Sequence, residues 1–260
     1  MTLSNDPQPL WQPSPERIKS ANLTAFMAAL RRDWSVDVAD YAALWDFSVG
    51  DRETFWRAIW DFSEVIGDGP GDVAIENMDT MPGARFFPDA RLNFAENLLR
   101  RRGAGDAIVF WGENKVKRRL SWDELHAATS LLAQALAADG ISKGDVVAGF
   151  IPNLPEAVIA MLATTSLGAT WTSCSPDFGC QGVLDRFSQT EPKLLFCADG
   201  YHYNGKSHES LARVATFAAE LPTIERIVVV PYLGKSVGID AVSLADYIAP
   251  YKADDIAYTR

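Results

Sequence analysis

Cysteine is scarce in this sequence of 260 residues, which contains only Cys174, Cys180 and Cys197. Their number is odd and no two of them have the CxxC spacing, which argues against a disulfide framework and against a zinc site. We therefore expect no metal centre in the chain. Unpaired thiols also indicate a reducing compartment, so the expected location is the cytoplasm.

The sequence also has fewer basic than acidic residues, and it has no long hydrophobic run. The chain has 24 Lys and Arg against 34 Asp and Glu, a formal net charge of −10, and no broad basic patch of the kind that binds a nucleic-acid backbone. Its most apolar stretch, 157–171, is interrupted by Thr, Ser and Gly and is too short to cross a bilayer. The first residues lack the pattern of a secretory signal. We expect neither a nucleic acid nor a membrane as partner.

Apolar residues are plentiful, at 48% of the sequence against 22% charged, which is the composition of a globular protein with a sizeable core. The first hundred residues are predicted to be largely helical. Ser14 is a capping residue ahead of Pro15 at the first helical position, and apolar residues follow at helical spacing. The aromatic-rich segment 40–62 is interpreted as a helix packed on a core rather than as a ligand site.

The pattern then changes to short apolar runs that alternate with amphipathic helices. The expected strands are 107–111, 146–151, 169–173, 194–197 and 227–230. The expected helices are 122–138, 157–167, 181–189 and 207–219. Capping signals begin two of them, Ser121 with Glu124 and Asn153 with Glu156. This alternation predicts an α/β fold with a doubly wound, mainly parallel sheet covered by helices on both faces.

Two domains follow from these patterns. Residues 1–103 are expected to form an N-terminal helical region, and residues 104–260 the first α/β subdomain of a larger domain. The last stretch, 243–260, contains a short predicted helix and then a polar run with no closing strand. The second domain is therefore expected to be incomplete at its C-terminal side.

One segment fits a chemical motif. Residues 200–207 read GYHYNGKS, which matches the phosphate-loop pattern G-x-x-x-x-G-K-[ST], between an apolar strand and a predicted helix. Three bulky residues in succession crowd this loop, although close approach to phosphates favours small ones. The strand 227–230 also runs into Pro231 rather than a magnesium-binding carboxylate. The segment is thus a triphosphate-hydrolase loop, a plain surface turn, or a site for another phosphate-bearing ligand.

Several other segments, taken in order, are more specific than this motif. They are ARFFP at 84–88, LNFAENL at 92–98, GFIPNLPEA at 149–157, SCSPDFG at 173–179, GVLDRF at 182–187 and YNGK at 203–206. On these segments the chain resembles the adenylate-forming acyl-CoA synthetases of the acetoacetyl-CoA synthetase (acetoacetate–CoA ligase) type. The resemblance extends from about residue 11 to residue 233.

The resemblance implies an enzyme that adenylates acetoacetate with MgATP, releases pyrophosphate, and passes the acyl group from AMP to coenzyme A (CoA). It also implies a CoA-binding site at Tyr203, Asn204, Gly205 and Lys206, where acetyl-CoA synthetases have a short Arg/Gly/Lys-type loop. Lys206 is then expected to meet a CoA phosphate. Tyr203 stands where an Arg is common, so it is expected to stack on the adenine. The segment 175–179 is either a wall of the CoA or acyl channel or a plain turn.

The family's ATP loop, its adenine- and magnesium-binding motif and its C-terminal lid have no match in these 260 residues. We therefore expect no catalytic residue in the chain, no activity from it alone, and the remainder of the enzyme as its partner. Two alternatives stay open: a phosphate-loop hydrolase built on residues 200–207, and a non-catalytic paralogue that binds CoA or a ligase subunit.

Overall fold

The computed structural model describes residues 10–113, 115–235 and 237–260. Two compact units, Met1–Arg91 and Leu92–Arg260, divide the chain. The boundary between them precedes residue 103 because the helix at 94–98 packs on a helix of the second unit. The expected domains, 1–103 and 104–260, refer to the domains of the longer protein. The two units do not test them, so they stay a prediction. Within the described ranges, no helix has both the length and the apolar character needed to cross a bilayer.

The first unit is a small helical assembly with one short hairpin. Its elements are α1 (Pro15–Lys19), α2 (Asn22–Trp34), α3 (Tyr41–Gly50), α4 (Arg52–Phe62), β1 (Ile75–Glu76) and β2 (Arg85–Phe86). The expected start of α1 is confirmed, since the Ser14 hydroxyl accepts the amide of Arg17 and Pro15 is the first helical residue. The segment 40–62 forms two helices because Asp51 ends α3 and caps α4. Its side chains only partly pack on the core, and Trp45 is exposed.

The second unit is built on a parallel sheet. In the order β11-β10-β7-β5-β6, its strands are β11 (Val242–Ser243), β10 (Arg226–Val230), β7 (Leu194–Ala198), β5 (Val146–Phe150) and β6 (Thr170–Cys174). Every pairing in this sheet is parallel. Strands of this kind need helical crossovers, which cover both faces of the sheet.

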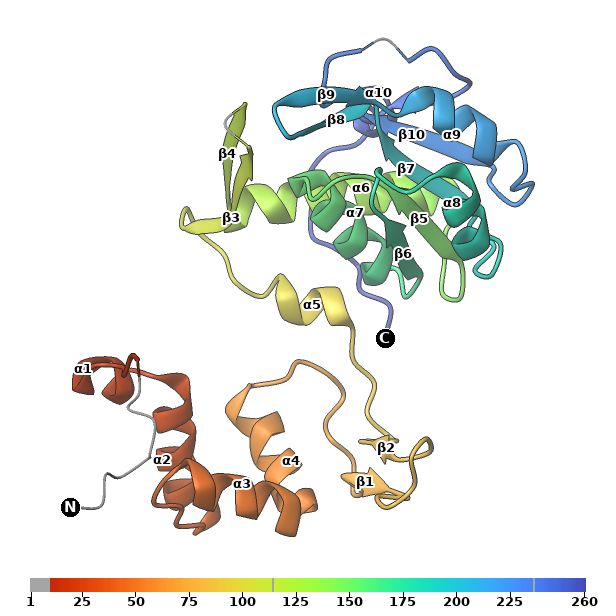
Figure 1. Cartoon of the computed structure of the whole chain (residues 1–260). Helices are drawn as coiled ribbons and strands as arrows, with labels where there is room; N and C mark the ends of the chain where they lie inside the picture. The colour runs from red at the N-terminus through yellow and green to blue at the C-terminus, as the bar shows by residue number, and fades with distance from the viewer. Residues whose placement is uncertain (1–9, 114, 236) are drawn as a thin grey trace, which may run out of the picture. The chain divides into compact units, whose positions relative to one another are not determined.

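Helices cover the two faces of the sheet as expected (Figure 1). They are α6 (Trp122–Ala138), α7 (Pro155–Ser166), α8 (Cys180–Phe187) and α9 (Leu211–Ala218), while α5 (Phe94–Leu98) packs on α7 and α10 (Leu244–Ile248) contacts α6 and β10. Successive strand residues enter opposite cores: Phe196 packs with α6 and α7, whereas Leu195 and Cys197 pack with α8 and α9. The predicted α/β class with a doubly wound, mainly parallel sheet is confirmed.

Two antiparallel hairpins lie outside that sheet, and they account for the main errors of the expected strand list. They are formed by β3 (Asp106–Gly112) with β4 (Val116–Ser121), and by β8 (Gly200–Tyr203) with β9 (Lys206–Glu209). Strand β3 was expected among the parallel strands but pairs only with β4 in the described part of the chain. Strand β4 was not expected because three charged residues fill its centre and lie exposed.

The helix caps gave one correct and one wrong expectation. The Ser121 hydroxyl and the Glu124 carboxylate form a complete capping box at the start of α6. At α7 the capping residue is Leu154, not Asn153, and Glu156 pairs with Arg118 of β4 instead. A short edge strand was also missed, since β11, just before α10, extends the sheet beyond β10.

Candidate active-site region at the carboxyl ends of the strands

Three loops leave the carboxyl ends of β5, β6 and β7 at one edge of the sheet. Strand β6 pairs with one side of β5 and β7 with the other, so the chain changes direction across the sheet next to β5. Open parallel sheets bind their ligands at such a position. A cavity of about 470 Å³ lies there, lined by Ile151, Pro152, Asn153, Ser173, Cys174, Ser175, Pro176, Asp177, Tyr201, His202 and Tyr203. Of the segment 175–179, the first three residues border this cavity, and whether they form a channel wall or a plain turn stays a prediction.

The segment with the phosphate-loop letters, 200–207, is a β-hairpin. Tyr203 of β8 lies opposite Lys206 of β9, which leaves a two-residue turn. Its residues are Asn204, with φ of 50°, and Gly205, with φ of 74°. Two successive left-handed residues form a type I′ turn, for which Asn-Gly is a preferred sequence. The turn follows from Asn204 together with Gly205, whereas the phosphate-loop pattern requires Gly205 and leaves residue 204 unspecified.

This hairpin overturns the hydrolase alternative and the predicted helix start at residue 207. Ser207 to Glu209 continue as a strand, and α9 begins only at Leu211. A phosphate loop needs amides that converge in front of a helix N-terminus, whereas here the side chains pair across two strands. The rings of Tyr201 and His208 stack with centroids 5.1 Å apart. The segment therefore agrees with the phosphate-loop pattern in residue types only, and does not have the conformation of a phosphate loop.

The hairpin brings together the four residues expected to bind CoA. Tyr203 lines the cavity with 68% of its surface exposed, while Asn204, Gly205 and Lys206 form an exposed tip beside it. A Cβ atom placed on Gly205 would meet nothing within 4 Å, so the Cα side of Gly205 faces open space. An aromatic ring and an ammonium group are thus presented together on one accessible edge, a combination suited to a nucleotide with phosphate groups.

Asp199, which sequence reasoning did not single out, fixes the loop next to this edge through hydrogen bonds. It follows β7 directly and is 1% exposed. Its carboxylate accepts the backbone amides of Tyr232, Leu233 and Lys235, each at 2.8 Å. The loop after β10 is thereby fixed beside the hairpin, where the ring of Tyr232 lies 5.2 Å from that of His202. An Asp after a buried strand was the available signal, but its partners lie more than thirty residues away.

The loop after β6 is held by two arginines. Arg186 lies over the ring of Phe178, 4.2 Å from its centroid, and Arg213 donates to the Phe178 carbonyl at 3.2 Å. Cys174, at the end of β6, lines the cavity but is 7% exposed. Burial raises the pKa of its thiol to about 11, although the charge of Arg186 opposes this. A thiol so fully protonated near neutral pH is a packing residue rather than a nucleophile.

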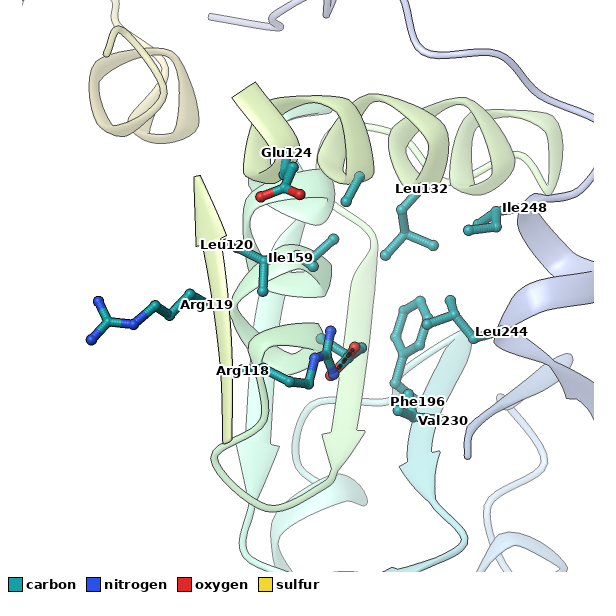
Figure 2. Close-up of a pocket in the computed structure, with 12 residues that line it drawn as sticks. Arg118, Arg119, Leu120, Glu124, Leu132, Ile159, Phe196, Val230, Leu244 and Ile248 are labelled. Atoms are coloured by element: carbon teal, nitrogen blue, oxygen red, sulfur yellow. Dashed lines mark hydrogen bonds and ion pairs between the residues drawn. The ribbon is translucent and has the colours of Figure 1, made fainter. Parts of the chain in front are cut away.

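A second cavity, of about 480 Å³, lies on the face of the sheet that α6 and α7 cover. Apolar side chains make up most of its lining, from α6, α7, α10 and the strands beneath them (Figure 2). Arg118 extends into it and pairs with Glu156 at 2.7 Å, whereas Arg119 points away. It contains no histidine, cysteine or hydroxyl side chain, so we assign it no chemistry.

Metal binding needs a cluster of suitable donors. In the part of the chain that the structure describes, no group of three or more His, Cys, Asp or Glu residues lies close enough to hold a metal ion. We therefore assign no magnesium ligand to these residues.

Comparison with known proteins agrees with this geometry. A protein-family model described as AMP-binding enzyme matches residues 96–259, which include the whole parallel sheet and the β8–β9 hairpin. The chain belongs to the AMP-binding enzyme family. A second model, described as the acetyl-coenzyme A synthetase N-terminus, matches residues 41–98. Membership of the AMP-binding family thus covers the second unit, and the acetyl-CoA synthetase type of N-terminus covers most of the first.

Individual members of the AMP-binding family are similar over almost the whole chain. The acetoacetyl-coenzyme A synthetase of Rhizobium meliloti (strain 1021) is 48% identical over 97% of this chain, and that of Gallus gallus 35% identical over 95%. The solved structure of the acetoacetyl-CoA synthetase from Streptomyces lividans matches 97% of the chain with a TM-score of 0.90 and 39% identity. The chain spans 39%, 38% and 39% of the length of these three relatives.

Proposed function

We propose that this chain is the N-terminal part of an ATP-dependent acetoacetate–CoA ligase, which converts acetoacetate, ATP and CoA into acetoacetyl-CoA, AMP and pyrophosphate. The close structural likeness to the Streptomyces lividans synthetase is the observation that carries this proposal. A cytoplasmic location is part of it, supported by cysteines that are all free thiols.

Within this reaction, the role we propose for the chain is to bind the nucleotide end of CoA. The Lys206 ammonium group would pair with a CoA phosphate, and the ring of Tyr203 would stack on the adenine. Asn204 and Gly205 would bring the chain close to the ligand, since both are exposed and the Cα side of Gly205 faces open space. The cavity beside Tyr203 offers a path from this edge towards the carboxyl ends of β5 and β6.

The chemical steps need donors aimed at the groups where charge develops. We propose that the groups which bind ATP and magnesium lie in a further part of the enzyme, which is then the necessary partner of these 260 residues. The chain alone is therefore expected to bind CoA weakly and to catalyse no acetoacetate-dependent exchange of pyrophosphate into ATP. Such exchange by the purified 260-residue chain would contradict this division of roles.

The direct test is an activity assay of the longer protein that contains these 260 residues and is as long as its relatives. We expect acetoacetate-dependent formation of acetoacetyl-CoA and AMP. Lys206→Ala should raise the KM for CoA by about fivefold, the scale of one exposed ion pair, and leave pyrophosphate exchange, which precedes CoA, unchanged. Lys19→Ala, on the exposed side of α1, is the matched control. No activity with acetoacetate would overturn the proposal.

The acid substrate needs its own experiment. The malonamoyl-CoA synthetase of Penicillium aethiopicum is 34% identical over 85% of this chain, so a similar N-terminal part accompanies a different acid in that protein. Both acids carry a carbonyl carbon two positions from the carboxylate carbon. A comparison of kcat/KM for acetoacetate, malonamate and acetate separates the options. We expect acetoacetate to be preferred.

A further inference from the structure

The tip of the β8–β9 hairpin is contacted by the other hairpin of the second unit. The backbone amide of Gly205 donates to Glu113 Oε2 at 3.1 Å, across 92 residues of sequence. Glu113 follows directly after β3 and has a φ of 51°, and the turn there is closed by the Lys115 amide on the Gly112 carbonyl at 3.1 Å. The two hairpins therefore meet turn to turn.

The Gly205 amide is available for this contact because of the turn type. In a two-residue hairpin turn the flanking residues, here Tyr203 and Lys206, exchange the ladder hydrogen bonds, and the amides of the turn residues point away from the ladder. In an exposed turn such an amide is free to bind either water or a nearby side-chain acceptor. The Glu113 carboxylate supplies that acceptor at 3.1 Å.

Packing around Tyr232 holds the two hairpins in this arrangement. A Cβ atom added to Gly112 would overlap the Tyr232 hydroxyl, so a larger residue is not accommodated beside that ring. The Tyr232 ring also lies 6.2 Å from that of Phe110 and 5.2 Å from that of His202. Burial, followed by the charge of Glu113, raises the pKa of Tyr232, which agrees with a carboxylate close to this packed group.

We propose that Glu113 is a positioning residue for CoA binding. Its carboxylate fixes the Asn204–Gly205 turn. This turn then orients the Tyr203 ring and the Lys206 ammonium group for the nucleotide end of CoA. This inference rests on the proposed CoA contact of the hairpin. A negative charge beside a phosphate site opposes the ligand, so the site uses the hydrogen bond of Glu113 and not its charge.

Two substitutions separate the hydrogen bond from the charge. Glu113→Ala removes the acceptor and should raise the dissociation constant for CoA by about fivefold, the scale of one hydrogen bond. Glu113→Gln keeps an acceptor oxygen without the charge, so it should bind CoA at least as tightly as the wild type. The measurement is calorimetric titration of the gene product with CoA, and Glu220→Ala, which removes an exposed carboxylate at the end of α9, is the matched control.

A purely structural role is tested by the kinetic readouts. We expect Glu113→Ala to raise the KM for CoA while kcat, the melting temperature and acetoacetate-dependent pyrophosphate exchange stay unchanged. If Glu113→Ala binds CoA as tightly as the wild type or more tightly while Lys206→Ala weakens binding, the inference is overturned and the CoA site stands. If neither variant changes CoA binding, the hairpin is not the CoA contact, and the site and the inference fall together.

Discussion

The side-chain nitrogen of Asn93 lies 2.7 Å from the carbonyl oxygen of Thr259, 166 residues further along the chain. The same nitrogen donates to the carbonyls of Thr165 and Ser166 at 2.9 and 3.0 Å, and the side-chain oxygen accepts the amide of Glu96. Asn93 is 2% exposed. One buried amide group therefore joins the start of α5, the end of α7 and the final residues of the chain.

Asn93→Asp tests this junction, because it keeps the cap of α5 and removes the donor. A carboxylate would then face three carbonyl oxygens in a buried place, so we expect a loss of about 2–4 kcal/mol of unfolding free energy. Urea unfolding measures the loss, and hydrogen exchange should become faster in residues 249–260. Asn22→Asp, at the exposed start of α2, is the control and should change neither quantity. Unchanged exchange in 249–260 would show that the junction does not hold this segment.

Asp199 offers a second test of a buried polar group. Asp199→Ala leaves the amides of Tyr232, Leu233 and Lys235 without their acceptor, so we expect a loss of about 2–4 kcal/mol. CoA binding should weaken as well, since the loop after β10 supports the hairpin through Tyr232 and His202. Urea unfolding and calorimetric titration with CoA measure the two effects. The exposed Asp240→Asn serves as control, and a stable variant with full CoA affinity would refute the supporting role.

Much of the fold could be predicted because its signals are local. The capping box of Ser121 and Glu124 spans four residues, and the apolar runs of β5, β7 and β10 record burial on both faces of a sheet. The pairing of β3 with β4 could not be predicted, because the charged residues of β4 resemble a polar connection. Pairing with a neighbouring strand stabilises β4, and propensity alone does not reveal that contribution.

The candidate site divides in the same way. Tyr203 to Lys206 are contiguous, so a short resemblance was enough to select them. Their supports, Glu113, Asp199 and Tyr232, come from three other segments, and only the folded chain brings them to the hairpin. The phosphate-loop letters misled for a related reason. They encode residue types at fixed spacing, whereas the conformation is decided by the Asn204–Gly205 turn.

His126 on α6 is expected to make the stability of the protein depend on pH in the acidic range. Its Nε2 is buried without a hydrogen-bond partner among the described residues. Burial, and then the charge of Arg102, lowers the pKa of His126, while Asp255 and Asp123 oppose the shift. A lowered pKa means that the folded state binds the proton less readily than the unfolded state. The stability contribution is therefore complete above the ordinary histidine pKa and is lost as the pH falls through the folded value.

We expect the NMR titration midpoint of His126 to lie below 6.5, the reference value for histidine. Between pH 7.5 and 5 in a urea series, wild-type stability should fall more steeply than that of His126→Asn, which cannot take up the proton. Equal slopes for the two proteins would show that protonation of His126 is not linked to folding.

The cysteines provide a last prediction, on thiol reactivity. Burial raises the pKa of Cys174 to about 11 and that of Cys197 to about 12, and the charge of Asp199 adds to the shift at Cys197. Because the thiolate is the reactive form, both should resist a disulfide reagent at pH 8 in the folded protein, whereas the half-buried Cys180 reacts first.

We therefore expect one fast thiol in the native protein, lost in Cys180→Ser, and three in denaturant. The raised pKa values also have a consequence for stability. The folded state holds these protons more tightly than the unfolded state, so the contribution is complete below the ordinary thiol pKa and is lost as the pH rises towards 11 and 12. Cys197→Ala should make the alkaline fall in unfolding free energy shallower. If Cys197 reacts as fast as Cys180 in the native protein, the prediction is wrong. Strand β7 would then open far more often than is expected of a central strand that is packed on both faces.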